Sequence, residues 1–259
     1  MKSVELNDID KLPGKRVEKG ETFQFRCHDG LSCFNLCCRN LNLFLTPYDV
    51  IQLKNCLGIT SGEFLEKHTH VVMRHHAHFP DVLLKMAEND EKTCPFLTEK
   101  GCSVYPMRPD SCRTFPVEEG VIFEGDKREK IYLFRPPDFC MGKTEDVEWT
   151  IESWETDQDA VTYHKMTALW AEVKHLFHSD PWGVEGPEGR KAQMAFMATY
   201  NMDDFRTFVF ESSFLKRFKI KSDVRMKAKK EDIALMKLGF EWVRFFLFNE
   251  KVRNIAIKK

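Results

Sequence analysis

Four cysteines lie within the twelve residues from Cys27 to Cys38, and they constrain this chain more than any other feature. So many thiols in so short a segment are too crowded to pack separately as small apolar side chains. Arg39 and the polar residues around the thiols favour an open, electropositive loop in which thiol pKa values fall. Thiolates bind soft metal ions, so this segment is a candidate metal site.

The spacing of these cysteines separates their roles. If residues 33–37 form one helical turn, Cys33 and Cys37 share a face and can bind one ion, with Cys27 arriving from the preceding loop. Cys38 then points elsewhere, because neighbouring side chains on a helix diverge by about 100°. Further ligands are therefore needed from elsewhere in the chain.

The downstream cysteines lie close to proline, glycine or arginine, which favours turns over regular helix. Pro106, Pro109 and Pro116 exclude a long helix from residues 102–116. Cys56 is interpreted instead as a small buried apolar residue of a helix. The predicted metal ligands are the other eight cysteines: Cys27, Cys33, Cys37, Cys38, Cys94, Cys102, Cys112 and Cys140.

Three ordered blocks give the chain a resemblance to a known family. They are the cysteines of residues 27–38, CPFL at residues 94–97, and CSVYPMRPDSCRTFP at residues 102–116. Over residues 23–142 the chain resembles the YkgJ family of cysteine-cluster proteins, which implies a domain that chelates zinc or iron. That family is labelled by a CxxCxCC pattern, whereas here five residues separate Cys27 from Cys33 and three separate Cys33 from Cys37. Flagellin lysine N-methylases carry a similar block, so the resemblance also raises methyl transfer to protein lysine.

Composition narrows the setting. The chain has 259 residues, a net charge of −1, and 42% hydrophobic and 31% charged residues, which excludes wholesale disorder and any global attraction to nucleic acid or anionic membranes. No window approaches the ~18 apolar residues of a membrane-spanning helix, and the start lacks an apolar signal segment. We expect a cytoplasmic protein with reduced thiols, in which metal is favoured over disulfides about four to one. A protein partner is left open.

The fold class that we expect is α+β and mainly helical. A cysteine-rich N-terminal half holds short strands and loops, and the C-terminal half is helical. Residues 1–22 form a lead-in, residues 23–145 the cysteine-cluster metal-binding domain, and residues 146–259 a helical region packed against it. The run of residues 145–159, with seven acidic and no basic side chains, marks the boundary.

Capping and periodicity predict individual elements. Thr46 and Pro47 begin a helix that runs to about Leu57 and stops at Gly58, and Thr60 begins a second helix. The other expected elements are a strand at 82–86, a hairpin of 117–123 with 130–134, and helices at 161–177, after Asn201, and at 231–249.

Two other clusters were weighed. Five histidines between His68 and His78 permit a second metal site, but without ligands at a recognisable spacing a solvated loop and strand edge is favoured about three to one. His28 has the best claim to a ligand or supporting role, against that of a surface histidine. Arg108 and Arg113 either offset thiolate charge or pair with surface carboxylates. The basic residues 216–230 could hold an acidic protein surface or nucleic acid, but a solvated face is favoured.

Three functions remain in order. The first is a protein that binds zinc or iron through clustered thiolates: zinc in a closed four-sulfur site would be structural, and iron in an iron–sulfur cluster would be redox-active. The second is an S-adenosylmethionine-dependent lysine N-methyltransferase, against which stands the lack of a glycine-rich strand-to-helix turn. The third is a metal carrier or sensor. Whether the protein is an enzyme stays open.

Overall fold

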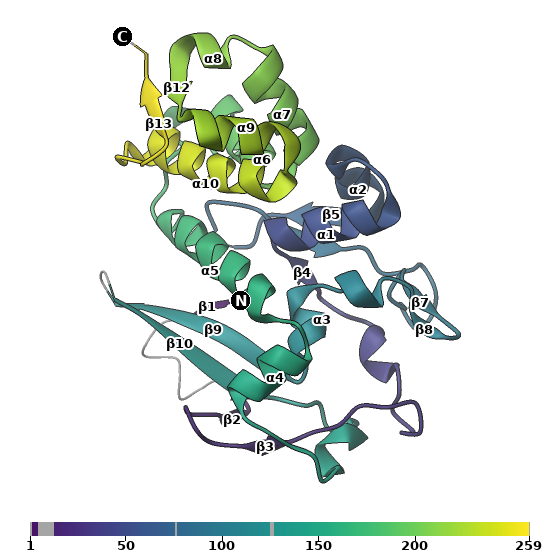
Figure 1. The fold of residues 1–259 in the computed structure, drawn as a ribbon. Coiled ribbons are helices and arrows are strands. Elements are labelled where there is room, and N and C mark those ends of the chain that lie inside the picture. The colour runs from purple at the N-terminus through teal and green to yellow at the C-terminus, as the bar shows by residue number, and fades with distance from the viewer. Residues whose placement is uncertain (1, 5–12, 76, 125–126, 259) are drawn as a thin grey trace. The chain divides into compact units, whose positions relative to one another are not determined.

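The computed structural model describes residues 2–4, 13–75, 77–124 and 127–258. Two compact units form: Met1–Leu43 with Lys85–Ala171, and Phe44–Leu84 with Glu172–Lys259. The predicted limits at residues 22 and 145 stay predictions. His76 and residues 5–12 of the predicted lead-in lie outside the described residues. Helices dominate the described chain and small sheets accompany them, which confirms a mainly helical α+β fold (Figure 1).

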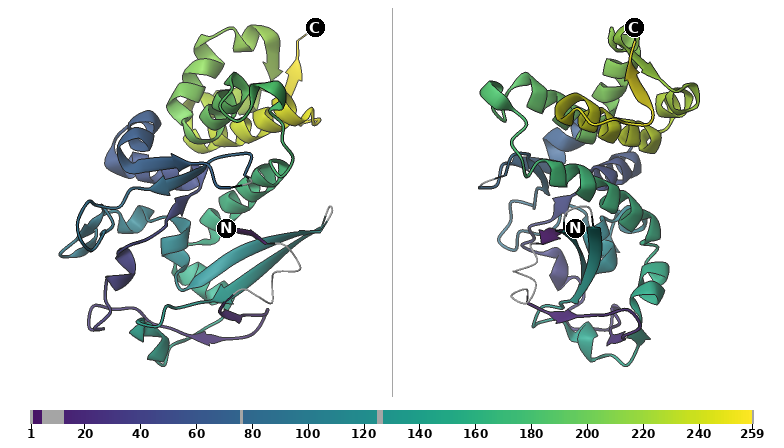
Figure 2. Two further views of the ribbon diagram at one scale, coloured as in Figure 1. Left: turned by 180° about the vertical axis from the view of Figure 1, so that it is seen from behind. Right: turned by 90° about the vertical axis from the view of Figure 1, so that its left-hand side faces the viewer.

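The first unit is built on a four-stranded sheet with the order β1-β9-β10-β2. Strands β9 and β10 are eight residues long and antiparallel, with Val117 opposite Phe134, so the predicted hairpin is confirmed. Figure 2 shows this hairpin from two further sides. The bounds are β1 (Lys2–Val4), β2 (Lys15–Arg16), β9 (Val117–Glu124) and β10 (Lys127–Phe134).

An aromatic core beside this sheet anchors the segment that leads to Cys27. The ring of Phe25 packs edge-on against Phe115 and Trp154, with centroids 5.9 and 5.6 Å away. Trp149 Nε1 donates a hydrogen bond of 2.7 Å to the carbonyl oxygen of Phe25. Because Phe25 is only 1% exposed and held on several sides, the chain that follows it leaves the core from a fixed position.

Short elements carry the remaining residues of the first unit. Strand β3 (Phe23–Gln24) pairs with β11 (Glu148–Trp149), and β7 (Leu97–Thr98) pairs with β8 (Gly101–Cys102). The prolines of residues 102–116 limit that segment to a 3-10 helix at Tyr105–Met107 and the five-residue α3, as expected. The helices are α3 (Asp110–Thr114), α4 (Ile151–Asp157) and most of α5 (Val161–Leu176).

The second unit begins with two helices whose caps match the sequence. Thr46 and Thr60 each form a capping box, and Gly58 ends α1 with φ 66°. The bounds are α1 (Pro47–Leu57) and α2 (Ser61–His68), beside a sheet of β4 (Phe44–Leu45), β6 (Asp81–Leu84) and β5 (Thr69–Val72). The prediction that Cys56 is buried is wrong: its side chain is exposed, because α1 buries the face that carries Val50 and Leu53.

Helix α10 organises the rest of the second unit, lying alongside α6 and α9 (Figure 1). Gly239 lets α10 approach α6 closely, because a Cβ atom there would lie 1.9 Å from the carbonyl oxygen of Ala198. The basic α9 exposes most of its side chains and buries Ala228. The bounds are α6 (Arg190–Tyr200), α7 (Met202–Glu211), α8 (Phe214–Arg217), α9 (Ser222–Lys230), α10 (Asp232–Phe248), β12 (Phe218–Ile220) and β13 (Ile255–Ile257). No helix among the described residues is both long and apolar enough to cross a bilayer.

Candidate metal centre

All eight predicted ligand cysteines belong to the first unit, although they come from six separate segments of it. Each of the nine cysteines of the chain carries a free thiol. Cys27 follows β3, Cys37 and Cys38 lie in a 3-10 helix (Leu36–Cys38), and Cys112 lies on α3. Turns and chain ends of short elements therefore present most of the sulfur atoms.

The expected helical turn over residues 33–37 is wrong. Asn35 adopts the left-handed conformation with φ 65°, and only the following three residues form a 3-10 helix. Asparagine tolerates this conformation, and Arg39 Nη1 donates a hydrogen bond of 2.8 Å to its carbonyl oxygen. Cys33 and Cys37 are thus presented by a tight reversal of the chain.

A close approach of two distant segments brings Cys33 next to Cys140. The two thiols share a hydrogen bond, and the backbone N–H of Met141 donates to Cys33 Sγ at 3.2 Å. Gly142 permits this approach, because a Cβ there would lie 2.7 Å from the ring of Phe25 and 2.8 Å from the Arg26 carbonyl oxygen. Backbone N–H groups that donate to sulfur stabilise thiolates, as metal-binding sulfurs require.

Backbone pairing attaches the downstream cysteines to the first cluster. The N–H of Cys94 donates to the carbonyl oxygen of Cys38 at 2.8 Å, and Arg39 forms a β-bridge with Thr93. Cys102 is held next to this segment, since it pairs with Leu97 in the β7–β8 hairpin. The sequence blocks that carry the family resemblance therefore meet in space.

The thiols differ in how readily they ionise. A hydrogen bond from Cys38 lowers the pKa of Cys37 in spite of its burial, and the same bond, with burial, raises the pKa of Cys38. Burial raises the pKa of Cys94 to about 11 and also raises the pKa values of Cys27 and Cys140. The expected lowering thus holds for Cys37, whereas metal binding at the other three must displace protons.

Charge interactions group the thiols further. Cys27 interacts with Cys33, Cys38 and Cys140, and Cys37 interacts with Cys112 as well. No three of the thiol sulfurs lie within 4.8 Å of one another, by a search of the described residues. In a four-sulfur zinc site the sulfurs are roughly 3.8 Å apart, given bonds of about 2.3 Å. The structure therefore gathers the donors without closing a coordination shell.

His28 supports the loop and does not offer a ligand atom. Its Nδ1 accepts a hydrogen bond of 3.2 Å from the N–H of Gly30, which places the ring proton on Nε2. That Nε2 lies 3.3 Å from Glu145 Oε2 and donates to it. Both ring nitrogens are engaged, so of the two roles weighed for a histidine near the thiols the supporting one fits this geometry.

Arg108 and Arg113 fasten the loop around Cys112. Arg113 is 3% exposed and donates to the carbonyl oxygens of Gln158 and Pro106 at 2.7 and 2.6 Å. Arg108 donates to the Gln158 side chain at 2.9 Å, and its charge also interacts with the thiols of Cys112 and Cys102. Their main role is to hold the loop, and Arg108 offsets some of the thiolate charge as well.

The sequence interpretation missed one group of ionisable side chains in this unit, Glu119, Glu155 and His164. They are far apart in the chain and follow no ligand spacing. The one available signal was His164, which lies on the face of α5 that also buries Tyr163 and Thr167.

The donor set fits zinc or iron. Several free thiols meet, backbone N–H groups point at sulfur, and soft or borderline metals prefer such ligands. A family model described as CxxCxxCC, "Putative zinc- or iron-chelating domain", matches residues 26–158, just over half of the chain. The chain belongs to the CxxCxxCC family. This is the YkgJ-type family of cysteine-cluster proteins, so the resemblance seen in the sequence is confirmed. No curated protein and no solved structure matched the chain in the corresponding searches.

Proposed function

We propose that this CxxCxxCC protein binds zinc or iron through thiolates of its first unit and works in a reducing compartment, the cytoplasm. The meeting of Cys33 and Cys140, with the Met141 N–H aimed at sulfur, is the observation that carries this proposal. Two chain segments more than a hundred residues apart would have little reason to bury thiols together without a shared ligand. The proposed ligands are drawn from Cys27, Cys33, Cys37, Cys38, Cys94, Cys102, Cys112 and Cys140, within a metal-binding domain of residues 23–145.

The thiol count is enough for two four-sulfur sites. Zinc held by four thiolates is structural, whereas iron as a sulfide cluster supplies electron transfer. The chain's own contribution is the same in either case: backbone N–H groups stabilise the sulfurs, and Arg108 offsets part of their charge.

Metal content after anaerobic purification tests this function. We expect stoichiometric zinc, or iron with visible absorbance, in the unmodified protein. Replacing Cys33 and Cys140 together by serine should remove at least half of that metal. Cys56→Ser is the matched control, since Cys56 is exposed on α1 of the other unit and should leave the metal content unchanged. A folded protein without zinc or iron would refute the proposal.

Metal delivery is a second candidate, favoured by the exposure of two thiols. Cys27 and Cys112 are both exposed, so a competing ligand can reach a metal bound by them. Rapid transfer of bound zinc to a chelator of moderate affinity is the expected result for a carrier or sensor. A picomolar, non-transferable site would speak against it.

Methyl transfer to protein lysine gains no support from the described residues, and we do not advance it. Calorimetry with S-adenosylmethionine remains its direct test, and binding heat would reopen it.

A further inference from the structure

Three elements of the first unit bring nitrogen and oxygen donors together apart from the thiols. Glu119 on β9, Glu155 on α4 and His164 on α5 offer ligand atoms that all lie within 4.8 Å of one another. His164 Nδ1 lies 3.1 Å from Glu119 Oε2 and 2.9 Å from Glu155 Oε1. The other ring nitrogen, Nε2, lies 3.4 Å from Asp110 Oδ1 on α3. Four elements therefore surround one imidazole with carboxylates.

This group is buried and carries excess negative charge. The side chains of Glu119 and His164 are each 5% exposed, and that of Asp110 is 9% exposed. Lys130, whose Nζ lies 2.6 Å from Glu119 Oε1, is the cation paired with it from β10. Three carboxylates facing one lysine and a neutral histidine leave uncompensated charge, which is costly away from water unless a cation balances it.

Proton counting leaves ligand atoms available. The single Nδ1 hydrogen of His164 is hydrogen-bonded to Glu155. Glu119 Oε2 then receives no hydrogen bond, although the side chain is buried, and His164 Nε2 makes none either. Burial raises the pKa of Glu119 in spite of His164 and Lys130, as expected for a carboxylate whose charge is incompletely balanced. A carboxylate oxygen and a ring nitrogen therefore face the same buried space without donors.

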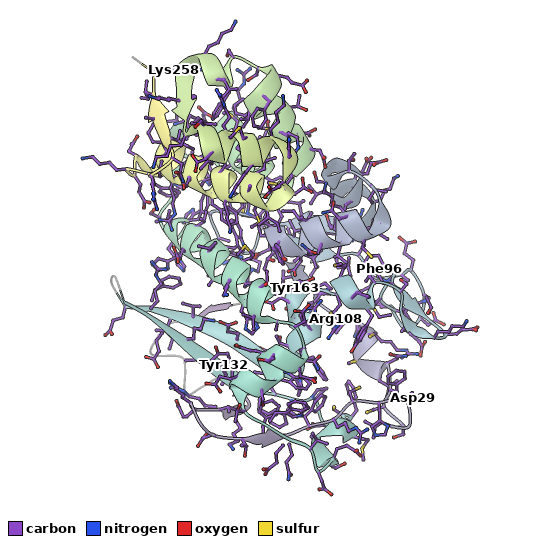
Figure 3. The ribbon with its side chains drawn as sticks, in the orientation of Figure 1. Asp29, Phe96, Arg108, Tyr132, Tyr163 and Lys258 are labelled. Atoms are coloured by element: carbon purple, nitrogen blue, oxygen red, sulfur yellow. The ribbon has the colours of Figure 1, made fainter. Side chains whose placement is uncertain are left out.

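Neighbouring hydroxyl groups hold the carboxylates in place. Tyr132, labelled in Figure 3 where β10 passes α4, donates a hydrogen bond of 3.2 Å to Glu155 Oε1. Thr167 Oγ1 donates to Asp110 Oδ2 at 2.9 Å. Such outer hydrogen bonds orient the ligands of metal sites.

We propose that Glu119, Glu155 and His164 bind a divalent transition-metal ion, with Asp110 as a fourth donor. Carboxylate and imidazole donors suit Mn²⁺, Fe²⁺ and Zn²⁺ and do not select the soft ions that thiolates prefer. The site rests on none of the cysteines. Asp110 and Cys112 are two residues apart on α3, but Asp110 is buried and Cys112 exposed, so the helix presents them to different surroundings.

Manganese is the probe that separates this site from the thiols, because Mn²⁺ favours oxygen and nitrogen ligands. Full-length protein, first freed of metal with a chelator, is titrated with Mn²⁺ while electron paramagnetic resonance follows the free ion. We expect one saturable site, weakened at least tenfold by Glu119→Gln and unchanged by the double serine variant of Cys33 and Cys140. Loss of Mn²⁺ binding in that cysteine variant alone would assign the ion to the thiols and overturn the proposal.

The matched control is Glu118→Gln, the neighbouring carboxylate of β9. Glu118 lies on the exposed side of the strand, where it pairs with Arg135 at 3.4 Å, and its loss should leave Mn²⁺ affinity unchanged. Equal affinity in Glu119→Gln and the unmodified protein, or no saturable binding at all, would overturn the proposal.

Thermal melting separates a metal site from a purely structural ion pair. Without metal, Glu119→Gln should melt at or above the temperature of the unmodified protein, because it removes uncompensated buried charge. Mn²⁺ should raise the melting temperature of the unmodified protein and not that of the variant. A metal-free variant that melts lower, or fails to fold, would show that the carboxylate is needed as an ion pair and would overturn the proposal.

Discussion

Replacing Gly142 by alanine should disrupt the approach of residues 140–142 to the segment that carries Cys27. The new Cβ would lie 2.7 Å from a ring carbon of Phe25 and 2.8 Å from the carbonyl oxygen of Arg26. Neither neighbour moves easily. Phe25 is 1% exposed, and the N–H of Arg26 is bonded to the Gly142 carbonyl oxygen at 3.0 Å.

The expected loss of stability follows from two opposing effects. Restricting the unfolded chain by a glycine-to-alanine change stabilises by about 0.4–1 kcal/mol where the backbone conformation allows alanine. Overpacking a rigid contact costs about 1–3 kcal/mol. The overlap should win, with a net loss of about 1–2 kcal/mol. For a chain of this size, that loss lowers the melting temperature by roughly 2–8 °C.

The same substitution should weaken the metal site. Moving residues 140–142 displaces the Met141 N–H from Cys33 Sγ, and losing such outer contacts typically costs about 10–100-fold in metal affinity. Thermal melting and competitive zinc titration measure the two effects. Gly62→Ala is the control, because its nearest neighbour would be an ordinary 3.6 Å away. If the Gly142 variant melts no lower than the unmodified protein, the steric reasoning is refuted.

Two further predictions concern the second unit. Gly239→Ala should lower the melting temperature, because the added Cβ would lie 1.9 Å from the Ala198 carbonyl oxygen; an unchanged melting curve would contradict the close approach of α10 and α6. Burial raises the pKa of Asp203, but hydrogen bonds of 2.6 Å from the Ser61 N–H and hydroxyl outweigh it and the pKa is lowered. The unfolding free energy gained from the Asp203 carboxylate should therefore be complete above the unfolded value near 3.8 and be lost as pH falls through the lower folded pKa. Acid unfolding of Asp203→Asn checks this: its deficit against the unmodified protein should shrink below about pH 4, and a constant deficit would contradict the assignment.

Local chemistry was readable from the sequence. Thr46 and Thr60 begin helices because their side chains cap the first turn, and Gly58 ends α1 because it takes the left-handed conformation. The hairpin of β9 and β10 followed from alternation. Each of these features depends on residues within a few positions of one another.

Features that depend on distant residues were not readable. Asn35 breaks the expected turn between Cys33 and Cys37, and a left-handed asparagine has no strong sequence signal. The exposure of Cys56 depends on which face of α1 is buried. Glu119 and His164 meet only because α5 packs on β9, which no spacing along the chain encodes.

X-ray absorption at the edge of the bound metal tests sulfur ligation most directly. For protein purified anaerobically with its own zinc or iron, the account predicts a first shell dominated by sulfur, at about 2.3 Å for zinc. A first shell made only of oxygen and nitrogen, at about 2.0–2.1 Å for zinc, would contradict a thiolate centre in this protein.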